Sequence, residues 1–289
     1  MIGPVLDTIF GADGHNLPGL RIATPAGLSL STLRAPGDAD TTAAPSAPLT
    51  VHMLWVEGEL CRLGQLSCAS FLAHGYDVQL WTYGGLTNAP GDVTLRDARE
   101  ILPENRIFRY PNGSLAAFAN LFRYAVLARF GGLWSDTDVI CLIPAARLRL
   151  AAPDGFLATE RVRGQRRVWI NNNVIFHPAP RRGDVIDLAF RFCEGYDPAR
   201  LEWGDCGPKL LTTLVTQWRA LAPPLMAARV ANPVNYWDCP KALLSPRTRL
   251  GPDTAFLHCY NEMWRRAGVD TDAPFPPTSL IGRIAARYQ

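Results

Sequence analysis

Two aspartates, Asp136 and Asp138, interrupt an otherwise apolar stretch over residues 133–143. In an extended chain, residues i and i+2 point to the same side, so both carboxylates could reach one cation. Proteins hold Mg²⁺ or Mn²⁺ beside a diphosphate with carboxylates that leave other coordination positions open. Charge inside an apolar strand is costly unless it is used or paired. The pair therefore predicts a metal site, although acidic pairs in turns are also common on solvated surfaces.

The residues before this pair predict the elements that position it. Ser114 is a candidate helix N-cap, and apolar residues recur over residues 115–126 at the i, i+3, i+4, i+7 spacing of a buried helical face. The glycines at 131–132 should end this helix, because glycine takes the left-handed conformation without a steric penalty. Buried strands are then expected at residues 133–134 and 139–143, on either side of the acidic interruption.

Asn120, Arg123 and Tyr124 are spaced i, i+3, i+4 and therefore share one face of the predicted helix. Polar groups on that face could meet a ligand at the carboxyl end of the following strand. The alternative is a partly exposed helix edge, with the Arg123 side chain reaching into solvent.

Residues 118–139 read F-x-N-L-F-R-Y-x-x-L-x-x-x-G-G-L-W-S-D-T-D-V, and this order resembles the DXD-containing sugar-binding region of GT-A glycosyltransferases. The resemblance is to the group that contains α-mannosyltransferases, α-1,4-N-acetylglucosaminyltransferases, glucosylating bacterial toxins and bacterial capsular-polysaccharide enzymes. That group has a nucleotide-contacting aspartate where this chain has Asn120, and a tyrosine where it has Trp134. Asn120 can still donate and accept hydrogen bonds there, but it lacks the charge.

The resemblance implies roles for residues in several segments. It implies that Asp136, Asp138 and Arg123 are catalytic, and that Asp136, Asp138 and His258 hold Mn²⁺ or Mg²⁺. The residues implied in nucleotide-sugar binding are Trp55, Asp97, Asn120, Tyr124, Gly132, Asn172 and Asn173.

Several of these residues also have an ordinary structural interpretation. Trp55 could be a core tryptophan, and Asp97 could be an N-cap. His258 could be a hydrogen-bonded core residue in an apolar strand. Asn172 and Asn173 belong to a run of three asparagines expected at the start of a strand, where they could form Asx turns instead.

Residues 51–56, 60–74 and 78–81 predict a strand, a helix and a strand, a βαβ unit that is normally parallel and right-handed. Together with the resemblance, this predicts an α/β fold with a GT-A-like, Rossmann-type, mostly parallel sheet flanked by helices. One glycosyltransferase domain is expected over residues 49–289. Residues 1–48 are rich in Gly, Pro, Ala, Thr and Asp and predict an N-terminal extension and linker.

Composition narrows the class of protein. The 289 residues, 48% of them hydrophobic, can bury one sizeable core. The net charge of +3, without a basic block, argues against nucleic-acid binding. Seven scattered cysteines without a C-x-x-C pair favour reduced thiols in a cytosolic protein. Since no apolar run reaches about 18 residues, we expect a cytoplasmic protein, at most peripheral at the inner face of the membrane.

We therefore expect a metal-dependent glycosyltransferase. It would move a sugar from a nucleotide-diphosphate sugar to a hydroxyl acceptor such as a bacterial surface polysaccharide, a lipopolysaccharide or another glycan. A UDP-linked donor and retention of configuration are implied by the resemblance alone. The basic segment 161–167 could form a rim for an anionic acceptor.

Two other functions stay open. Residues 136–140, D-T-D-V-I, nearly fit the D-x-D-x-[TV] motif of haloacid-dehalogenase-like phosphohydrolases, with Asp136 as nucleophile, but the downstream lysine and acidic motif are missing. The second is a sugar-binding relative that has lost activity, since Asn120 departs from the family pattern.

Overall fold

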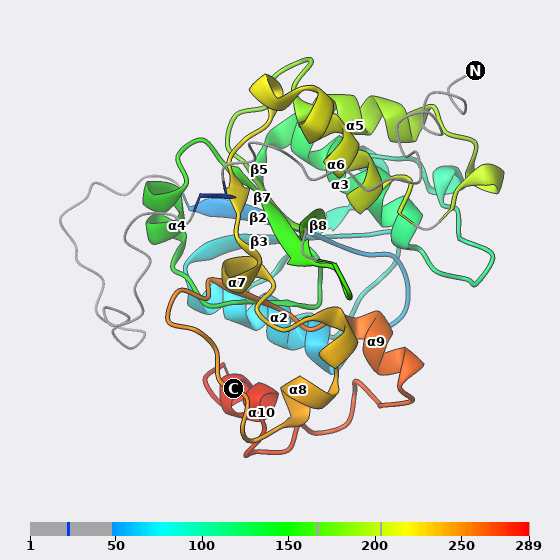
Figure 1. Cartoon of the computed structure of the whole chain (residues 1–289). Coiled ribbons are helices and arrows are strands. Elements are labelled where there is room, and N and C mark those ends of the chain that lie inside the picture. Colours follow the sequence, from blue (N-terminus) through cyan, green and yellow to red (C-terminus); the bar gives the residue numbers. More distant parts are fainter. Residues whose placement is uncertain (1–21, 24–47, 166–167, 203, 289) are drawn as a thin grey trace.

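The computed structural model describes residues 22–23, 48–165, 168–202 and 204–288. Figure 1 shows a central sheet covered by helices on both faces. Most of the predicted extension and linker over residues 1–48 lies outside the described residues. The described parts are Pro48 and the short strand β1 (Ile22–Ala23).

Eight strands of the described chain form the central sheet, in the order β1-β9-β7-β8-β5-β2-β3-β4. Strand β8 is antiparallel to both of its neighbours, while the remaining pairs are parallel, so every strand except β8 runs in one direction. Besides β1, the strands are β2 (Leu49–Trp55), β3 (Tyr76–Thr82), β4 (Thr94–Asp97), β5 (Gly132–Ser135), β7 (Phe156–Arg161), β8 (Val168–His177) and β9 (Leu225–Met226).

A two-stranded antiparallel ribbon stands outside this sheet. It pairs β6 (Val139–Cys141) with β10 (Phe256–His258). The two strands expected on either side of the acidic pair are therefore present, but they belong to different sheets. The chain leaves the central sheet after β5 and enters the ribbon at β6.

The helices form a layer on each face of the sheet (Figure 1). One layer contains α3 (Ala116–Phe130), α5 (Val185–Glu194) and α6 (Pro208–Gln217), whose apolar side chains pack in one cluster with Trp81 and Trp134. On the other face lie α2 (Arg62–Ala73), α7 (Ala228–Ala231), α8 (Lys241–Leu244), α9 (Asn261–Arg266) and α10 (Leu280–Ala285). The remaining helical segments are α4 (Ala145–Ala151) and short 3₁₀ turns at Ala98–Glu100, Glu104–Arg106, Pro198–Arg200, Arg219–Leu221 and Tyr236–Asp238.

Helix α3 starts and stops close to where the sequence predicts. The Ser114 hydroxyl accepts a hydrogen bond of 3.2 Å from the N–H of Ala116, the first helical residue. After Phe130 the chain bends at Gly131, which has φ 67° and ψ −150°. The positive φ was expected, but this ψ is not left-handed helical, because the chain turns directly into β5. A Cβ at Gly131 would lie 2.8 Å from the carbonyl oxygen of His177, so only glycine fits.

The predicted βαβ unit is present as β2, α2 and β3, with β2 and β3 parallel. From β2 the chain moves outward through β3 to β4, and then returns through α3 to β5 on the other side of β2. The chain connections therefore run in opposite directions from the boundary between β2 and β5, which makes this boundary a topological switch point. At such a point, α/β sheets bind ligands beyond the carboxyl ends of their strands. His52 pairs with Trp134, so the end of β2 at Trp55 and the end of β5 near Asp136 lie at the same edge.

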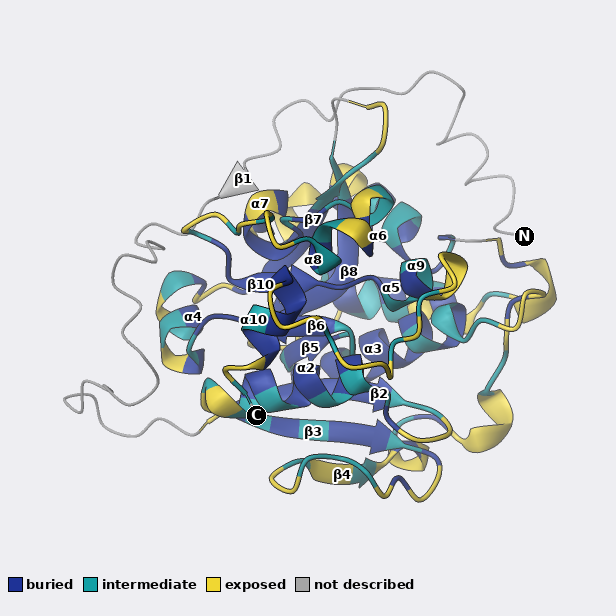
Figure 2. Ribbon diagram, turned by 90° about the horizontal axis from the view of Figure 1, so that it is seen from below, coloured by how far each residue is buried: buried dark blue, intermediate teal, exposed yellow. Residues whose placement is uncertain are grey.

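Burial follows this layering. Figure 2 shows the central strands largely buried and β4, at the edge of the sheet, mostly exposed. The predicted α/β fold, a mostly parallel sheet flanked by helices, is confirmed. Among the described residues, no helix combines the length and the apolar character needed to cross a membrane.

Candidate metal and sugar-nucleotide site

Asp136 and Asp138 lie in a turn between β5 and β6. The N–H of Val139 donates to the carbonyl of Asp136 at 3.2 Å, and the N–H of Asp136 donates to the carbonyl of Asn173 on β8 at 2.8 Å. The expectation that an extended chain aligns the two carboxylates was therefore wrong. The turn brings them to one side, where the chain passes from the sheet into the ribbon.

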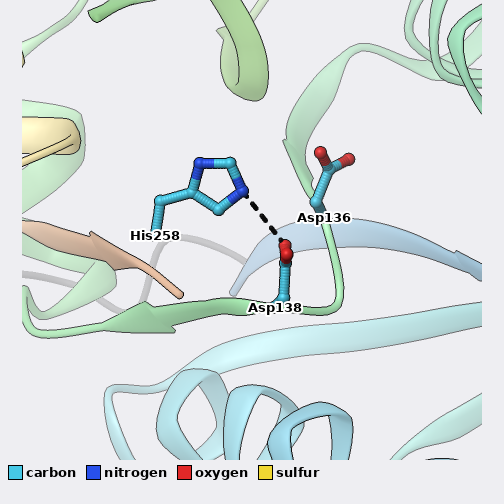
Figure 3. Close-up of side chains that lie close together, drawn as sticks. All are labelled: Asp136, Asp138 and His258. Carbon is cyan, nitrogen blue, oxygen red and sulfur yellow. Dashed lines mark ion pairs between the residues drawn. The ribbon is translucent and has the colours of Figure 1, made fainter. Parts of the chain in front are cut away.

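Strand β10 brings His258 to the same place. His258 pairs with Val139 in the antiparallel ribbon, so its side chain stands next to Asp138. The Nε2 atom of His258 lies 3.3 Å from Oδ1 of Asp138 (Figure 3). One ligand atom each from Asp136, Asp138 and His258 can be chosen so that all three lie within 4.8 Å of one another. The three residues predicted as metal ligands from distant parts of the sequence are thus neighbours.

The charged groups of this cluster shift one another's pKa values. Burial raises the pKa of Asp136, and the neighbouring charge of Asp138 adds to this, although Arg123 acts in the opposite direction. Burial also acts to raise the pKa of Asp138, but the charge and hydrogen bond of His258 and the N–H of Asn261 outweigh it and lower that pKa. For His258, burial acts downward, but Asp138 prevails and raises the pKa. Without a cation, the two carboxylates therefore favour the protonated form of His258.

The cluster fits a divalent cation. Two carboxylate oxygens and one imidazole nitrogen suit Mn²⁺, and they suit Mg²⁺ less well because of the nitrogen. The side chains of Asp136 and Asp138 remain 28% and 16% exposed, so a ligand can approach them. The Nδ1 atom of His258 is buried without a hydrogen-bond partner among the described residues.

Arg123 is buried and directed at the acidic turn. Its guanidinium lies 2.9 Å from Oδ1 of Asp136 and also donates to the carbonyl of Asn172. The same group stacks over the ring of Trp134 at 5.2 Å, and the indole N–H of Trp134 donates to Oδ1 of Asp136 at 2.9 Å. The solvent-exposed interpretation of Arg123 is therefore wrong, since the residue is only 4% exposed. Arg123 and Trp134 together fix the position of the Asp136 carboxylate.

Asn120, Tyr124 and Asn172 form one buried hydrogen-bond network. The amide nitrogen of Asn172 donates to Oδ1 of Asn120 at 2.9 Å and to the hydroxyl of Tyr124 at 3.1 Å. This network joins helix α3 to strand β8. It is linked to the ion pair of Arg123 and Asp136, because Arg123 donates to the carbonyl of Asn172. The shared helix face that the spacing predicts is present, and its polar groups meet strand β8.

Asn172 and Asn173 lie inside β8, and the expectation of a strand start was wrong. The pairing with β7 shifts by several residues between Leu157 and Ala158, which leaves Asn172 and Asn173 in a bulge. The N–H of Asn173 donates to Oδ1 of Asn171 at 2.9 Å, which closes an Asx-type turn. The Asn173 amide donates to Asn232 at 2.9 Å, a partner that the sequence pattern did not reveal.

The remaining predicted residues lie outside this network. Trp55 ends β2 at the expected edge and donates through its indole N–H to the carbonyl of Gly58 at 3.0 Å. Asp97 ends β4 and is mainly an N-cap, because its carboxylate accepts from the N–H of Arg99 at 2.9 Å and pairs with the Arg99 side chain.

Gly132 is not brought to the cluster. It stands at the amino end of β5, where a Cβ would lie 2.9 Å from the carbonyl oxygen of Thr50. It lines a cavity of about 560 Å³ at the opposite edge of the sheet, together with His52 and Arg96. A close packing of β5 on β2 explains this glycine without a ligand.

Comparison with known proteins supports the interpretation of the acidic turn. Residues 89–155 match the family model described as "Glycosyltransferase sugar-binding region containing DXD motif". The chain resembles the DXD glycosyltransferases. Over 96 residues it is 30% identical to human alpha-1,4-N-acetylglucosaminyltransferase. These 96 residues make up 33% of this chain and 24% of the relative. The chain therefore spans about a quarter of the length of that relative.

Solved glycosyltransferase structures are similar at a lower level. The PaToxG glycosyltransferase is 15% identical with a TM-score of 0.40, covering 59% of this chain and 69% of that one. The apo form of the glycosyltransferase GlyE of Streptococcus pneumoniae is 15% identical with a TM-score of 0.44, covering 84% and 60%. The bifunctional WbbM structure is 9% identical with a TM-score of 0.42, covering 85% and 52%.

Proposed function

We propose that this protein is a metal-dependent glycosyltransferase that moves a sugar from a nucleotide-diphosphate sugar to a hydroxyl acceptor. The observation that carries the proposal is that ligand atoms of Asp136, Asp138 and His258 lie within 4.8 Å of one another. Asp136 and Asp138 belong to the region that matches the DXD model. The cluster lies at the carboxyl edge of the sheet, where α/β folds bind nucleotides.

The site residues would have two roles: some bind the donor, and others stabilise the charge on the leaving diphosphate. Asp136, Asp138 and His258 would hold Mn²⁺ or Mg²⁺, which when bound supplies positive charge next to the leaving diphosphate. Arg123, fixed by Trp134 and Asn172, holds Asp136 in place and adds a second positive charge at the site. Trp55 and Asp97, at the ends of β2 and β4, would line the nucleoside side. Asn120, Tyr124, Asn172 and Asn173 would shape the sugar side.

The finer assignments are also proposals. The donor would be a UDP-sugar, transferred with retention, and the acceptor a bacterial surface polysaccharide, a lipopolysaccharide or another glycan. We assign the catalytic domain to residues 49–289. The reaction would take place in the cytoplasm or at the inner face of the membrane, and the seven free thiols are in line with a reducing compartment.

The phosphohydrolase alternative has less support. A phosphohydrolase needs Asp136 as a free nucleophile, whereas this carboxylate accepts bonds from both Arg123 and Trp134. The family match over residues 89–155 is to glycosyltransferases.

Incubation with a panel of nucleotide sugars separates these functions. With Mn²⁺ we expect release of UDP and free sugar from one or more UDP-sugars, and no release after chelation with EDTA. Release of inorganic phosphate from a phosphate ester would favour the phosphohydrolase. UDP binding without any turnover would favour the inactive relative.

A further inference from the structure

The cavity of about 560 Å³ lies at the amino ends of β2 and β5, at the edge of the sheet opposite the acidic turn. Strand β4 contributes Arg96 to its lining, α4 contributes Arg149, and the end of α3 contributes Phe130. Residues of β2, β3 and β8 also line it. Cavities of roughly 300 to 1,000 Å³ hold small organic ligands. This cavity therefore has the size of a ligand site.

The lining offers cationic donors. Among the described residues that line the cavity, Arg96 and Arg149 are positively charged and none is acidic. His52 also lines the cavity, but its ring is neutral at pH 7 because burial lowers its pKa to about 4. A guanidinium binds a phosphate or a carboxylate through paired, charge-assisted hydrogen bonds. The lining therefore favours an oxyanion.

Arg96 is held in place and still has donors to offer. Its guanidinium lies over the ring of Trp81 at 4.8 Å, and its Nη2 atom donates to Oε2 of Glu100 at 2.8 Å. Its Nε and Nη1 atoms have no hydrogen-bond partner within the described residues. The side chain of Glu100 is 46% exposed, so water screens this ion pair. An anion in the cavity can therefore compete with Glu100 for Arg96.

A second carboxylate, that of Asp77, bonds to the lining without belonging to it. Its Oδ2 atom accepts from the hydroxyl of Thr50 at 3.0 Å and from the amide of Gln79 at 3.1 Å. Thr50 and Gln79 line the cavity, whereas Asp77 does not. An anion in the cavity therefore meets the two arginines rather than this carboxylate.

One part of the lining is apolar. It consists of Phe130, Phe176, Pro153 and Pro178. Phe130 is 46% exposed, and its ring is stacked on that of Trp81 with the centroids 6.0 Å apart. An aromatic ring that stays exposed at a cavity offers contact to another flat apolar group. Apolar walls combined with a few charged groups are typical of sites for small molecules.

We propose that this cavity binds a small organic anion in which an oxyanion, either a phosphate or a carboxylate, is joined to an uncharged ring. Arg96 and Arg149 bind the oxyanion, and the ring packs against Phe130. The site is distinct from the proposed donor site, because the acidic turn lies at the other edge of the sheet. The inference is therefore independent of the transferase proposal.

Calorimetry of the full chain in EDTA tests this site alone, because the carboxylates of the acidic turn repel an oxyanion when no cation is bound. The probes are phenyl phosphate and benzoate, with inorganic phosphate and acetate as their counterparts without a ring. We expect a Kd below about 1 mM for at least one ring-bearing probe, and the tighter of the two identifies the oxyanion. Its counterpart without the ring should bind roughly two- to tenfold more weakly.

Four variants test the assigned contacts. Arg96→Gln and Arg149→Gln should each weaken binding of the tighter probe by about tenfold or more, the effect of a hydrogen bond to a charged group. Glu100→Gln should tighten binding by roughly two- to fivefold, because it releases Arg96 from a surface ion pair. Phe130→Ala should remove the advantage of the ring-bearing probe and leave binding of its counterpart unchanged.

Two controls complete the test, and thermal melting shows that each variant is folded. Arg266→Gln is the matched control, since Arg266 also pairs with a surface glutamate, Glu262, but lies on α9. It should bind the probes like the wild type, and so should Asp138→Asn. A Kd above about 1 mM for both ring-bearing probes, or binding that both cavity arginine variants leave within twofold, would overturn the proposal. Probe binding that Asp138→Asn changes more than threefold would place the anion at the acidic turn and overturn it as well.

Discussion

The carboxylate of Asp138 accepts a hydrogen bond of 2.7 Å from the backbone N–H of Asn261, although 123 positions separate the two residues. Asn261 is the first residue of α9, and N–H groups at a helix start favour a negative charge. The other oxygen of Asp138 faces His258. Asp138 therefore connects the acidic turn to the carboxyl-terminal segment, in addition to the metal-binding role that we propose for it.

This double role makes Asp138 the first test. We expect Asp138→Ala to reduce UDP-sugar turnover by a thousandfold or more, because a ligand that stabilises transition-state charge contributes on the order of several kcal/mol. Asp138→Asn should lose activity as well, but it should keep the bond from Asn261 and so melt closer to the wild type. Turnover is measured under saturating Mn²⁺ and stability by thermal melting.

Asp197→Ala is the matched control for this test, because Asp197 also accepts a backbone N–H, that of Ala199 at 3.0 Å, at a site remote in sequence. The control should keep its activity. Turnover of Asp138→Ala above about a tenth of the wild-type value would show that Asp138 does not bind the metal.

His258 should make metal binding depend on pH. Its pKa is raised by Asp138 despite burial, so the imidazole carries a proton to a higher pH than usual in the absence of metal. A ligand histidine must lose that proton, so Mn²⁺ affinity should fall as the pH drops from 8 to 6, with proton release on binding. Calorimetry in buffers of different ionisation enthalpy measures both quantities.

His258→Ala distinguishes the possible roles of this residue. A metal ligand predicts weaker Mn²⁺ binding in the variant, and a group that binds phosphate predicts weaker UDP binding that worsens toward high pH. Unchanged Mn²⁺-dependent UDP binding with a lower melting temperature would assign His258 to the core.

Local sequence patterns were sufficient to predict the helix on which Asn120, Arg123 and Tyr124 lie. The apolar spacing and the flanking Ser114 and Gly131 predicted α3, since a helix bounded by such residues depends on local preferences. The acidic pair and His258 were also correctly brought together, but only through a resemblance to a family. Nothing in the local pattern indicates that β10 pairs with β6, because antiparallel pairing over more than a hundred residues leaves no local pattern.

The parts that the sequence did not reveal depend on such long-range contacts. The three asparagines looked like poor strand formers, yet β8 accommodates Asn172 and Asn173 in a bulge where Asn120, Tyr124 and Asn232 bond them. Partners from other elements override the weak strand preference of asparagine.

Asn120 is expected to matter for stability as well as for the donor. Asn120→Ala would leave the Asn172 amide with one fewer acceptor in a buried site, at a cost of about 1–2 kcal/mol in the free energy of unfolding. Asn120→Asp keeps an acceptor for Asn172, so it should stay closer to wild-type stability and restore the family's charge. Urea unfolding and UDP titration with Mn²⁺ measure the two effects. Loss of stability in Asn120→Ala with unchanged UDP affinity in both variants would remove Asn120 from the donor site.

His52 should make the fold sensitive to acid. It is 3% exposed, its Nδ1 accepts the indole N–H of Trp81 at 3.2 Å, and burial lowers its pKa from 6.5 to about 4. Between about pH 6.5 and 4, the unfolded chain therefore binds a proton at His52 more readily than the folded chain does. The pKa difference of His52 therefore makes its full contribution to the free energy of unfolding above about pH 6.5. This contribution is lost as the pH falls toward 4, and the loss is about 2.5 kcal/mol at pH 4.5.

The variant His52→Gln isolates this effect, because glutamine can accept the indole N–H of Trp81 but does not titrate. Free energies of unfolding are measured in urea at pH 7.5 and 4.5 for both proteins. All other titrating groups are shared, so the wild type should lose about 2.5 kcal/mol more than the variant between the two pH values. Equal losses would mean that His52 gains access to water and protonates within the folded protein.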